Sequence, residues 1–234
     1  MAGTVSGSEA RAVITRTGHL KAMGIDVWVR RGAAVTGSAP ATDAGTAGSP
    51  ATLRDLEADV CVCTRCELHS TRTNTVFGAG DTAADWMFVG EAPGAEEDRQ
   101  GLPFVGRAGQ LLNAMLSAIG MTRDQVYIAN VLKCRPPNNR DPQGVEVGQC
   151  EPYLHRQVDL IQPTIIVAMG RFAAQSLLKT TRPIGKLRGE RFCYSDTDIP
   201  LVVTYHPAYL LRNPVDKRKA WADLLFARKV ALGA

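Results

Sequence analysis

Four short apolar runs alternate with helix-like segments from residue 52 onward, and this alternation most constrains the fold. The runs cover residues 86–89, 126–129, 164–169 and 201–204. Apolar residues at helical spacing fall at 110–119, 151–161, 171–179 and 217–230. Strands that alternate with helices predict a parallel sheet covered on both faces. We therefore predict an α/β fold, a three-layer α/β/α sandwich with a central, mainly parallel four-stranded sheet.

Each apolar run ends in a polar segment. These segments begin with Gly90-Glu91, Asn130, Gly170-Arg171 and Tyr205-His206. In open α/β sheets ligands bind beyond the carboxyl ends of the strands, so we expect these segments to converge on one site. Residues 90–109 are the most distinctive of them, with five glycines, two prolines and a group of carboxylates. We predict a functional loop there, between a strand and a helix.

The 234 residues suffice for one sizeable core with an appendage. Residues 32–51 carry one charge and no large apolar side chain, a composition that predicts a flexible linker. Residues 1–31 form an N-terminal extension that includes a short docking element, and residues 52–234 form the predicted globular domain. No apolar run reaches the length of a membrane helix, and no secretory signal is recognisable. We expect a cytoplasmic, intracellular protein that does not bind membranes.

The net charge of +4 and the pI near 8.8 permit a nucleic-acid partner without requiring one. The six cysteines favour metal ligation or redox chemistry over disulfides in an intracellular chain. Cys63 and Cys66 form a C-x-x-C pair, and Cys134 and Cys150 could complete a four-thiolate site. This spacing suits either zinc or an iron–sulfur cluster. Cys61, two residues before the pair, is an alternative ligand to Cys63.

Five motifs, in order and spacing, resemble the family 4 uracil-DNA glycosylases. They are GEAPG at 90–94, ED at 97–98, PFVGRAG at 103–109, NVLKCRPPNNR at 130–140 and HPAYLLR at 206–212. The resemblance covers roughly residues 60–230. It implies the uracil-DNA glycosylase fold, a [4Fe-4S] cluster on the four paired cysteines, and hydrolysis of uracil from DNA to leave an abasic site. PFVGRAG carries no inserted histidine that could trap the sugar, so we expect a monofunctional enzyme.

The resemblance implies a role for four pocket residues. Asn130 would read the Watson–Crick edge of a flipped uracil, and Phe104 would stack on its ring. Glu97 would lie near the C5 edge and exclude the thymine methyl group. His206 would donate a hydrogen bond to uracil O2 as negative charge grows there. Without the resemblance, a capping Asn, a core Phe, a solvated Glu and a structural His are the alternatives.

Water must capture the sugar after the uracil departs, and Glu91 is the candidate to orient or deprotonate it. Asn130 is the alternative for holding this water. The backbone N–H groups around Ala92 are candidates to bind uracil oxygens or a phosphate. Glu96 and Asp98, in the same loop, receive no chemical role.

The segment after His206 implies contacts with DNA. In the family, Leu210 and Leu211 would enter the duplex beside the flipped nucleotide, although core packing is the alternative. Arg212 and Arg188 are candidates for phosphate contacts. The basic residues 217–219 could also contact phosphates, although a solvated helix face is the favoured alternative.

We expect a monomer whose partner is uracil-containing DNA. Two other functions remain open at this point. One is a non-catalytic iron–sulfur DNA-binding module of the same fold, and the other is a zinc-stabilised hydrolase of small molecules.

Overall fold

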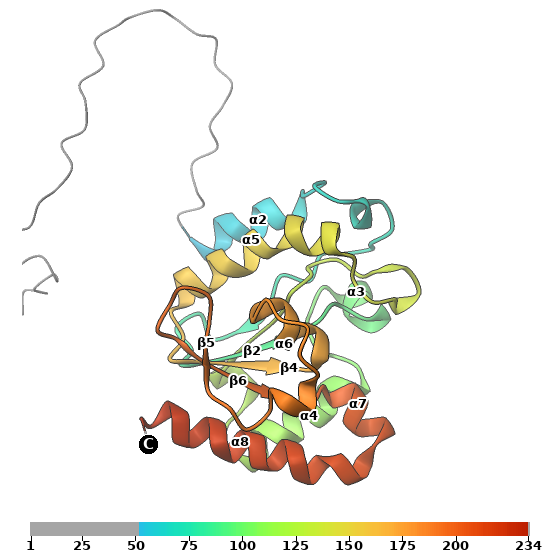
Figure 1. Cartoon of the computed structure of the whole chain (residues 1–234). Helices are drawn as coiled ribbons and strands as arrows, with labels where there is room; N and C mark the ends of the chain where they lie inside the picture. Colours follow the sequence, from blue (N-terminus) through green and yellow to red (C-terminus); the bar gives the residue numbers. More distant parts are fainter. Residues whose placement is uncertain (1–51, 234) are drawn as a thin grey trace, which may run out of the picture. The chain divides into compact units, whose positions relative to one another are not determined.

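The computed structural model describes residues 52–233. The predicted extension at 1–31 and the predicted linker at 32–51 lie outside the described residues. Figure 1 shows the described part as a sheet with helices on both of its faces. The predicted α/β class and its three layers are confirmed.

A six-stranded sheet of order β1-β3-β2-β4-β6-β5 forms the middle layer. The strands are β1 (Ala79–Gly80), β2 (Trp86–Gly90), β3 (Tyr127–Asn130), β4 (Ile165–Met169), β5 (Phe192–Cys193) and β6 (Pro200–Thr204). The four predicted strands are the central ones, and they run parallel. The prediction missed β1 and β5, which pair antiparallel at the two edges. Each has two residues, too few to show a period.

Helices cover both faces of this sheet. The helices are α2 (Leu53–Cys61), α3 (Ala95–Gln100), α4 (Arg107–Ala118), α5 (Gly144–Ile161), α6 (Arg171–Leu177), α7 (Pro207–Arg212) and α8 (Lys217–Ala231). The short 3-10 helices are η1 (Glu67–Ser70), η2 (Arg123–Gln125), η3 (Pro137–Asn139), η4 (Ile184–Lys186) and η5 (Pro214–Asp216). Helices α5 and α6 pack on one face and α4 and α8 on the other, while α2 packs against α5. None of the helices within 52–233 is long and apolar enough to cross a bilayer.

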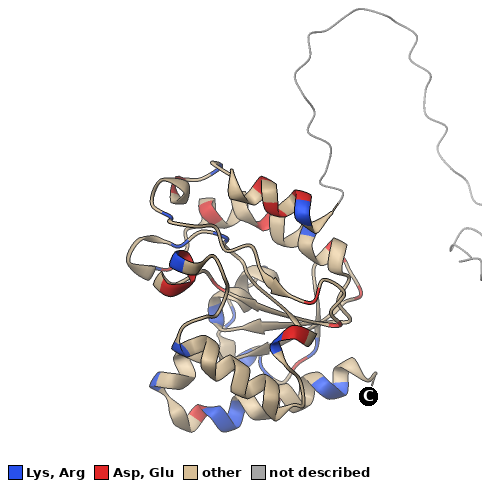
Figure 2. Cartoon of the chain, turned by 180° about the vertical axis from the view of Figure 1, so that it is seen from behind, with Lys and Arg blue, Asp and Glu red and all other residues tan. Residues whose placement is uncertain are grey.

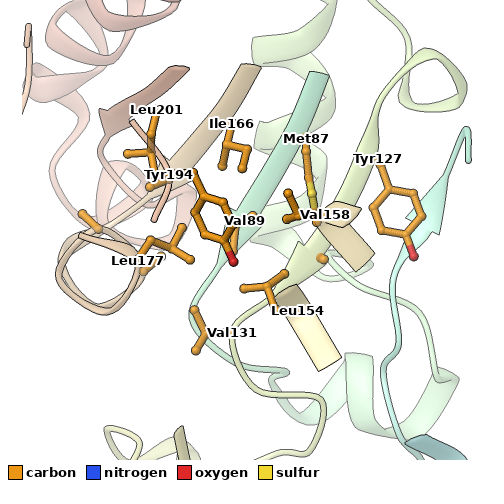
Figure 3. Close-up of a cluster of buried hydrophobic side chains, with 14 of the residues drawn as sticks. Met87, Val89, Tyr127, Val131, Leu154, Val158, Ile166, Leu177, Tyr194 and Leu201 are labelled. Carbon is orange, nitrogen blue, oxygen red and sulfur yellow. The ribbon is translucent and has the colours of Figure 1, made fainter. Parts of the chain in front are cut away.

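The central strands contribute to the core on both faces. Met87 and Val89 of β2 belong to the cluster under α5 and α6, which Figure 3 shows together with Leu154 and Leu177. The intervening Phe88 belongs to the cluster under α4 and α8. All residues of β2, β3 and β4 are buried, so these strands have continuous apolar sequences.

The segment 90–109, predicted as a loop, contains the short helix α3. Its carboxylates Glu96, Glu97 and Asp98 occupy the first turn, where the helix dipole favours negative charge. Gly101 ends the helix with a left-handed φ of +72°. The crowding of acidic residues that marks this segment in the sequence therefore belongs to the start of a helix.

Candidate active site

The carboxyl ends of the parallel strands lie at one edge of the sheet, as predicted. A cavity of about 440 Å³ opens there. Seven residues singled out in the sequence line it: Glu91, Ala92, Glu97, Phe104, Asn130, His206 and Arg212. They are separated by up to about half of the chain, and the sheet brings them together. Arg188, Leu210 and Leu211 do not line this cavity.

Asn130 ends strand β3 and is 2% exposed. Its side-chain Oδ1 is buried and has no hydrogen-bond partner among the described residues. Its backbone carbonyl accepts a hydrogen bond of 2.8 Å from Nζ of the buried Lys133. A buried acceptor without a partner is rare in folded proteins, so Oδ1 is a candidate to accept a hydrogen bond from a bound ligand.

Phe104 is buried and has a left-handed backbone, with a φ of +53°. Its ring lies beside the imidazole of His206, with the ring centroids 5.5 Å apart and the planes at 33°. Gly90 leaves the space that this arrangement needs. A Cβ atom at Gly90 would lie 2.4 Å from Asn130 Oδ1 and 2.7 Å from Phe104 Cζ, so only glycine lets these two side chains meet.

Glu97 lines the cavity, but one of its carboxylate oxygens is engaged. Oε1 accepts hydrogen bonds from the backbone N–H groups of Val105, at 3.0 Å, and Gly106, at 3.2 Å. The carboxylate therefore holds the segment that follows Phe104. The sequence did not indicate this contact, because it joins residues eight and nine positions apart outside any helix.

His206 is half-buried and precedes α7, whose N-cap it forms. Its Nδ1 accepts a hydrogen bond of 3.1 Å from the N–H of Ala208. Because Nδ1 is the acceptor, the proton of the neutral ring is on Nε2. Burial, and after it the charge of Arg212, lower the pKa of His206 to about 4, against an opposing effect of Glu97. The side chain is therefore a neutral donor through Nε2 at physiological pH.

Glu91 follows β2 directly and is partly buried. Burial raises the pKa of its carboxyl group, and the nearby charge of Asp141 raises it further, while Arg171 lowers it. Asp141 lines the same cavity and pairs with Arg171 at 2.8 Å. Sequence reasoning missed Asp141, although it directly follows the NVLKCRPPNNR motif.

The four cysteines of the predicted metal site line a second cavity. Cys134 and Cys150 are buried, and Cys63 and Cys66 are partly exposed. Cys61 does not line this cavity. Within 52–233, no three His, Cys, Asp or Glu side chains converge closely enough to hold a single metal ion.

Two donors point at the sulfurs of this second cavity. Arg72 Nη1 lies 3.2 Å from Cys134 Sγ, and the backbone N–H of Lys133 lies 3.2 Å from Cys150 Sγ. Burial raises the pKa of the Cys150 thiol to about 11, and Lys133 acts in the opposite direction. Sulfurs that receive such donors are suited to carry negative charge as metal ligands.

The second cavity is joined to the first by a short stretch of backbone. Residues 131 and 132 hydrogen-bond to the carbonyls of Gly90 and Glu91, both at 3.0 Å, immediately before Cys134. A ligand that holds Cys134 in place would therefore also restrain the end of β3.

The structure contradicts the predicted DNA contact of Leu210, and it shows that Arg188 already has a partner. Leu210 is 1% exposed and lines a cavity together with residues of α4 and α8, so it is a core residue and not a wedge. Leu211 is half-exposed and Arg212 is exposed. Arg188 forms a bidentate pair with Asp223, at 2.7 and 2.8 Å, and lies over the ring of Tyr205. A phosphate would have to compete with Asp223 for this guanidinium.

Basic residues lie at both ends of α8, as the blue ribbon segments of Figure 2 show. They include residues 217–219 at its start and Arg228 and Lys229 in its last turn. The start of α8 follows α7, which carries Leu211 and Arg212, so positive charge is concentrated in the chain segment that follows His206.

Comparison with known proteins agrees with this geometry. The model of the uracil DNA glycosylase superfamily matches residues 77–225, which include every residue that lines the 440 Å³ cavity. The chain is 44% identical over 187 residues to a type-4 uracil-DNA glycosylase of Sulfurisphaera tokodaii, across 77% of this chain and 85% of that protein. It is 46% identical over 170 residues to that of Archaeoglobus fulgidus, across 69% and 84%. It is 44% identical over 170 residues to that of Pyrobaculum aerophilum, across 69% and 86%. The chain therefore belongs to the uracil-DNA glycosylase superfamily and, within it, to the type-4 uracil-DNA glycosylases.

Proposed function

We propose that this glycosylase binds a flipped uracil in the 440 Å³ cavity and hydrolyses its N-glycosidic bond, leaving an abasic site in DNA. One observation carries the proposal. The buried Oδ1 of Asn130 has no partner among the described residues, and Asn130 lines a cavity that Phe104 and His206 also line. A base must leave the duplex to reach such a cavity.

The amide of Asn130 suits uracil and not cytosine. Uracil presents an acceptor at O4 and a donor at N3–H, so Nδ2 of Asn130 donates to O4 and Oδ1 accepts from N3–H. Cytosine presents the opposite pattern at both atoms. Each buried group left unpaired costs about 1–3 kcal/mol, which is enough to discriminate between the two bases.

Phe104 and Glu97 provide two further contacts to the base. The Phe104 ring stacks on the uracil, an interaction worth about 1–3 kcal/mol per base in single-strand binding. The side chain of Glu97, held by the amides of Val105 and Gly106, lies along the C5 edge, where it excludes the methyl group of thymine. Backbone N–H groups near Ala92 bind a uracil oxygen or a phosphate.

His206 stabilises the leaving uracil. Negative charge grows on uracil O2 as the glycosidic bond breaks, and a preorganised donor aimed at this oxygen stabilises the transition state more than the ground state. The hydrogen bond from Ala208 to Nδ1 supports this role, because it leaves the proton of the neutral ring on Nε2. No protonation of the ring is required.

Glu91 orients and deprotonates the water that captures the sugar. Its position at the end of β2 and on the wall of the cavity supports this role. The carboxylate also balances the positive charge of the oxocarbenium-like sugar. Burial raises its pKa, which makes it a better proton acceptor than an exposed glutamate.

We infer that Cys63, Cys66, Cys134 and Cys150 hold a [4Fe-4S] cluster. Four thiols around one cavity fit a polynuclear cluster, whereas the ligands of a zinc ion converge on a single point. When bound, the cluster cross-links the segment after α2, the segment after β3 and helix α5. Its role is structural, because it anchors the chain that leaves Asn130.

The DNA duplex contacts the segment that follows His206. Leu211, half-exposed next to Arg212, is the apolar side chain that fills the space of the flipped base. Arg212 lines the cavity and contacts a phosphate. The enzyme acts as a monomer, and it works inside the cell, where its DNA substrate is.

An assay on an oligonucleotide with a single deoxyuridine tests the proposal. Alkali-labile cleavage at the uracil is the expected result. Binding without base release would instead support a non-catalytic DNA-binding module. The purified protein is expected to be brown and to contain iron. A colourless protein that contains zinc would contradict the cluster assignment independently of the activity.

A further inference from the structure

The backbone of Phe104 adopts a conformation that an aromatic residue rarely takes. Its φ of +53° lies in the left-handed region, which side chains with a Cβ atom disfavour. Such residues persist only where their surroundings over-determine them, and they concentrate at functional sites. The carbonyl of Phe104 also approaches Gly109 closely, since a Cβ atom at Gly109 would lie 1.7 Å from this oxygen.

Two charged side chains hold this part of the backbone. Glu97 accepts hydrogen bonds from the N–H groups of Val105 and Gly106, which follow Phe104. Arg123 donates from Nη1 to the carbonyl of Phe104 at 3.1 Å and from Nη2 to the carbonyl of Pro103. The Glu97 carboxylate thus accepts hydrogen bonds from the N–H groups of this segment, and the Arg123 guanidinium donates to its carbonyl groups.

Arg123 is connected with the cavity through these hydrogen bonds. It lies in η2, after α4, and does not line the cavity. It belongs to none of the five motifs that mark the family. Its remaining side-chain contact is a weaker hydrogen bond of 3.4 Å to Asn113 Oδ1 in α4. Its hydrogen bonds are thus concentrated on the backbone that carries Phe104.

We propose that Arg123 is a positioning residue for uracil recognition, which holds the backbone of Phe104 so that the ring stacks on the flipped base. This proposal rests on the stacking role of Phe104. The fixed fork of the guanidinium explains why an arginine is needed, because it reaches two consecutive carbonyls at once, whereas a lysine offers a single charged point. The ring of Phe104 lies beside His206, so the same contacts also set the distance between the stacking and the catalytic side chains.

A double-mutant cycle between Arg123 and Phe104 tests the proposal. The variants are Arg123→Met, Phe104→Ala and the two combined, with Arg123→Lys as the conservative variant. Arg99→Met is the matched control, because Arg99 pairs with Glu96 on the surface of α3. The measurements are the single-turnover rate of uracil release, the inhibition constant of free uracil, and the Tm.

If Arg123 acts through Phe104, Arg123→Met weakens inhibition by free uracil by about 10- to 100-fold, the range that loss of a base–aromatic stack would produce. In the Phe104→Ala background the same change has an effect of less than about twofold, because the interaction is already lost. Arg123→Lys recovers part of the inhibition. Arg99→Met stays within about twofold of the parent enzyme.

Equal effects of Arg123→Met in both backgrounds would overturn the proposal, as would a fall in Tm with unchanged inhibition by free uracil. If Arg123→Met does not fold, Arg123→Lys takes its place in the cycle. A Phe104→Ala enzyme that binds free uracil as well as the parent would instead remove the stacking role. Failure of the proposed function and failure of the role of Arg123 therefore give different results.

Discussion

The ammonium group of Lys133 donates a hydrogen bond of 2.8 Å to the backbone carbonyl of Asn130, and a second one to Oε1 of Gln157. Gln157 donates in turn to the carbonyl of Phe77 and to the hydroxyl of Tyr127. This buried network ties the end of β3 to helix α5. It lies between the cavity that holds the Asn130 side chain and the cavity lined by cysteines.

Lys133→Met should destabilise the protein and lower uracil release. The change leaves the carbonyl of Asn130 and Oε1 of Gln157 buried without this donor, at a cost of about 1–3 kcal/mol in the free energy of unfolding. Chemical denaturation measures this cost. Lys179→Met is the control, since Lys179 forms an exposed ion pair with Glu151. Equal stability of the two variants would contradict the role of the buried network.

Gly90→Ala should reduce uracil release by about 10- to 100-fold, because the added methyl group displaces the ends of Asn130 and Phe104. The overpacking also costs about 1–3 kcal/mol of stability. Single-turnover kinetics and thermal unfolding measure the two effects separately. Gly144→Ala is the matched control, since a Cβ atom at Gly144 meets nothing within 4 Å. An active Gly90→Ala enzyme would show that the close approach is not required.

Asn130→Asp should lower the release of uracil, because an ionised carboxylate cannot donate to O4. The loss of this hydrogen bond corresponds to about 1–3 kcal/mol, or about 5- to 150-fold in rate. Release of cytosine from the matched oligonucleotide should increase relative to uracil. Asn138→Asp adds the same charge on an exposed neighbouring loop and serves as the control. Unchanged base selectivity in Asn130→Asp would exclude the proposed reading of the base.

The pH dependence of uracil release should show no inflection from titration of His206 near pH 6.5. His206 is already neutral there because its pKa is lowered to about 4, and Glu91 needs only to be ionised. The activity should fall on the acidic side as pH drops through the raised pKa of Glu91 and then through that of His206. A profile of kcat/KM measures this. An inflection near pH 6.5 that disappears in His206→Gln would show that the charged ring is the active form.

The lowered pKa of His206 also predicts how the stability of the protein changes with pH. The unfolded chain binds a proton on His206 below its ordinary pKa of 6.5, whereas the folded chain does so only near 4. His206 therefore makes folding less favourable as the pH falls from about 6.5 to about 4, and has no such effect above that window. His206→Gln should lose less stability over the same range. Denaturation curves at several pH values compare the two proteins.

Cys134→Ala should lower both the iron content and the Tm. Cys193→Ala is the control, because Cys193 is exposed in β5 and does not line the cysteine cavity. Cys61→Ala tests the alternative ligand and should resemble the control. Iron analysis together with thermal unfolding gives the readout. A Cys134→Ala protein with a full iron content would contradict the assignment, and iron loss in Cys61→Ala would show that Cys61 is a ligand.

The central strands and their polar ends were predictable from local patterns. Buried parallel strands have continuous apolar sequences, and the positions where these runs stop place Glu91, Asn130 and His206 at one edge of the sheet. The convergence of these residues follows from strand direction alone. The family resemblance then attached a chemical role to each of them. The cavity collects all three, although it does not by itself test the roles.

Short elements and side-chain partners were not predictable in this way. Helix α3 has only six residues, so its period is too brief to recognise. Leu210 has the same type of side chain as Leu211, and only the packing of α7 against α4 and α8 decides that Leu210 is buried. The pairing of Arg188 with Asp223 joins residues 35 positions apart.

The sequence by itself determined the α/β class, the four central strands and the residues at their carboxyl ends, because periodicity and strand ends are local properties of a chain. The tertiary structure decided which atoms of these residues already have hydrogen-bond partners. It left Oδ1 of Asn130 without a partner among residues 52–233, engaged Glu97 with the backbone after Phe104, and brought Arg123 to the carbonyls of Pro103 and Phe104. Hydrogen bonds between distant segments depend on how helices and strands pack, and packing leaves no periodic mark on the sequence.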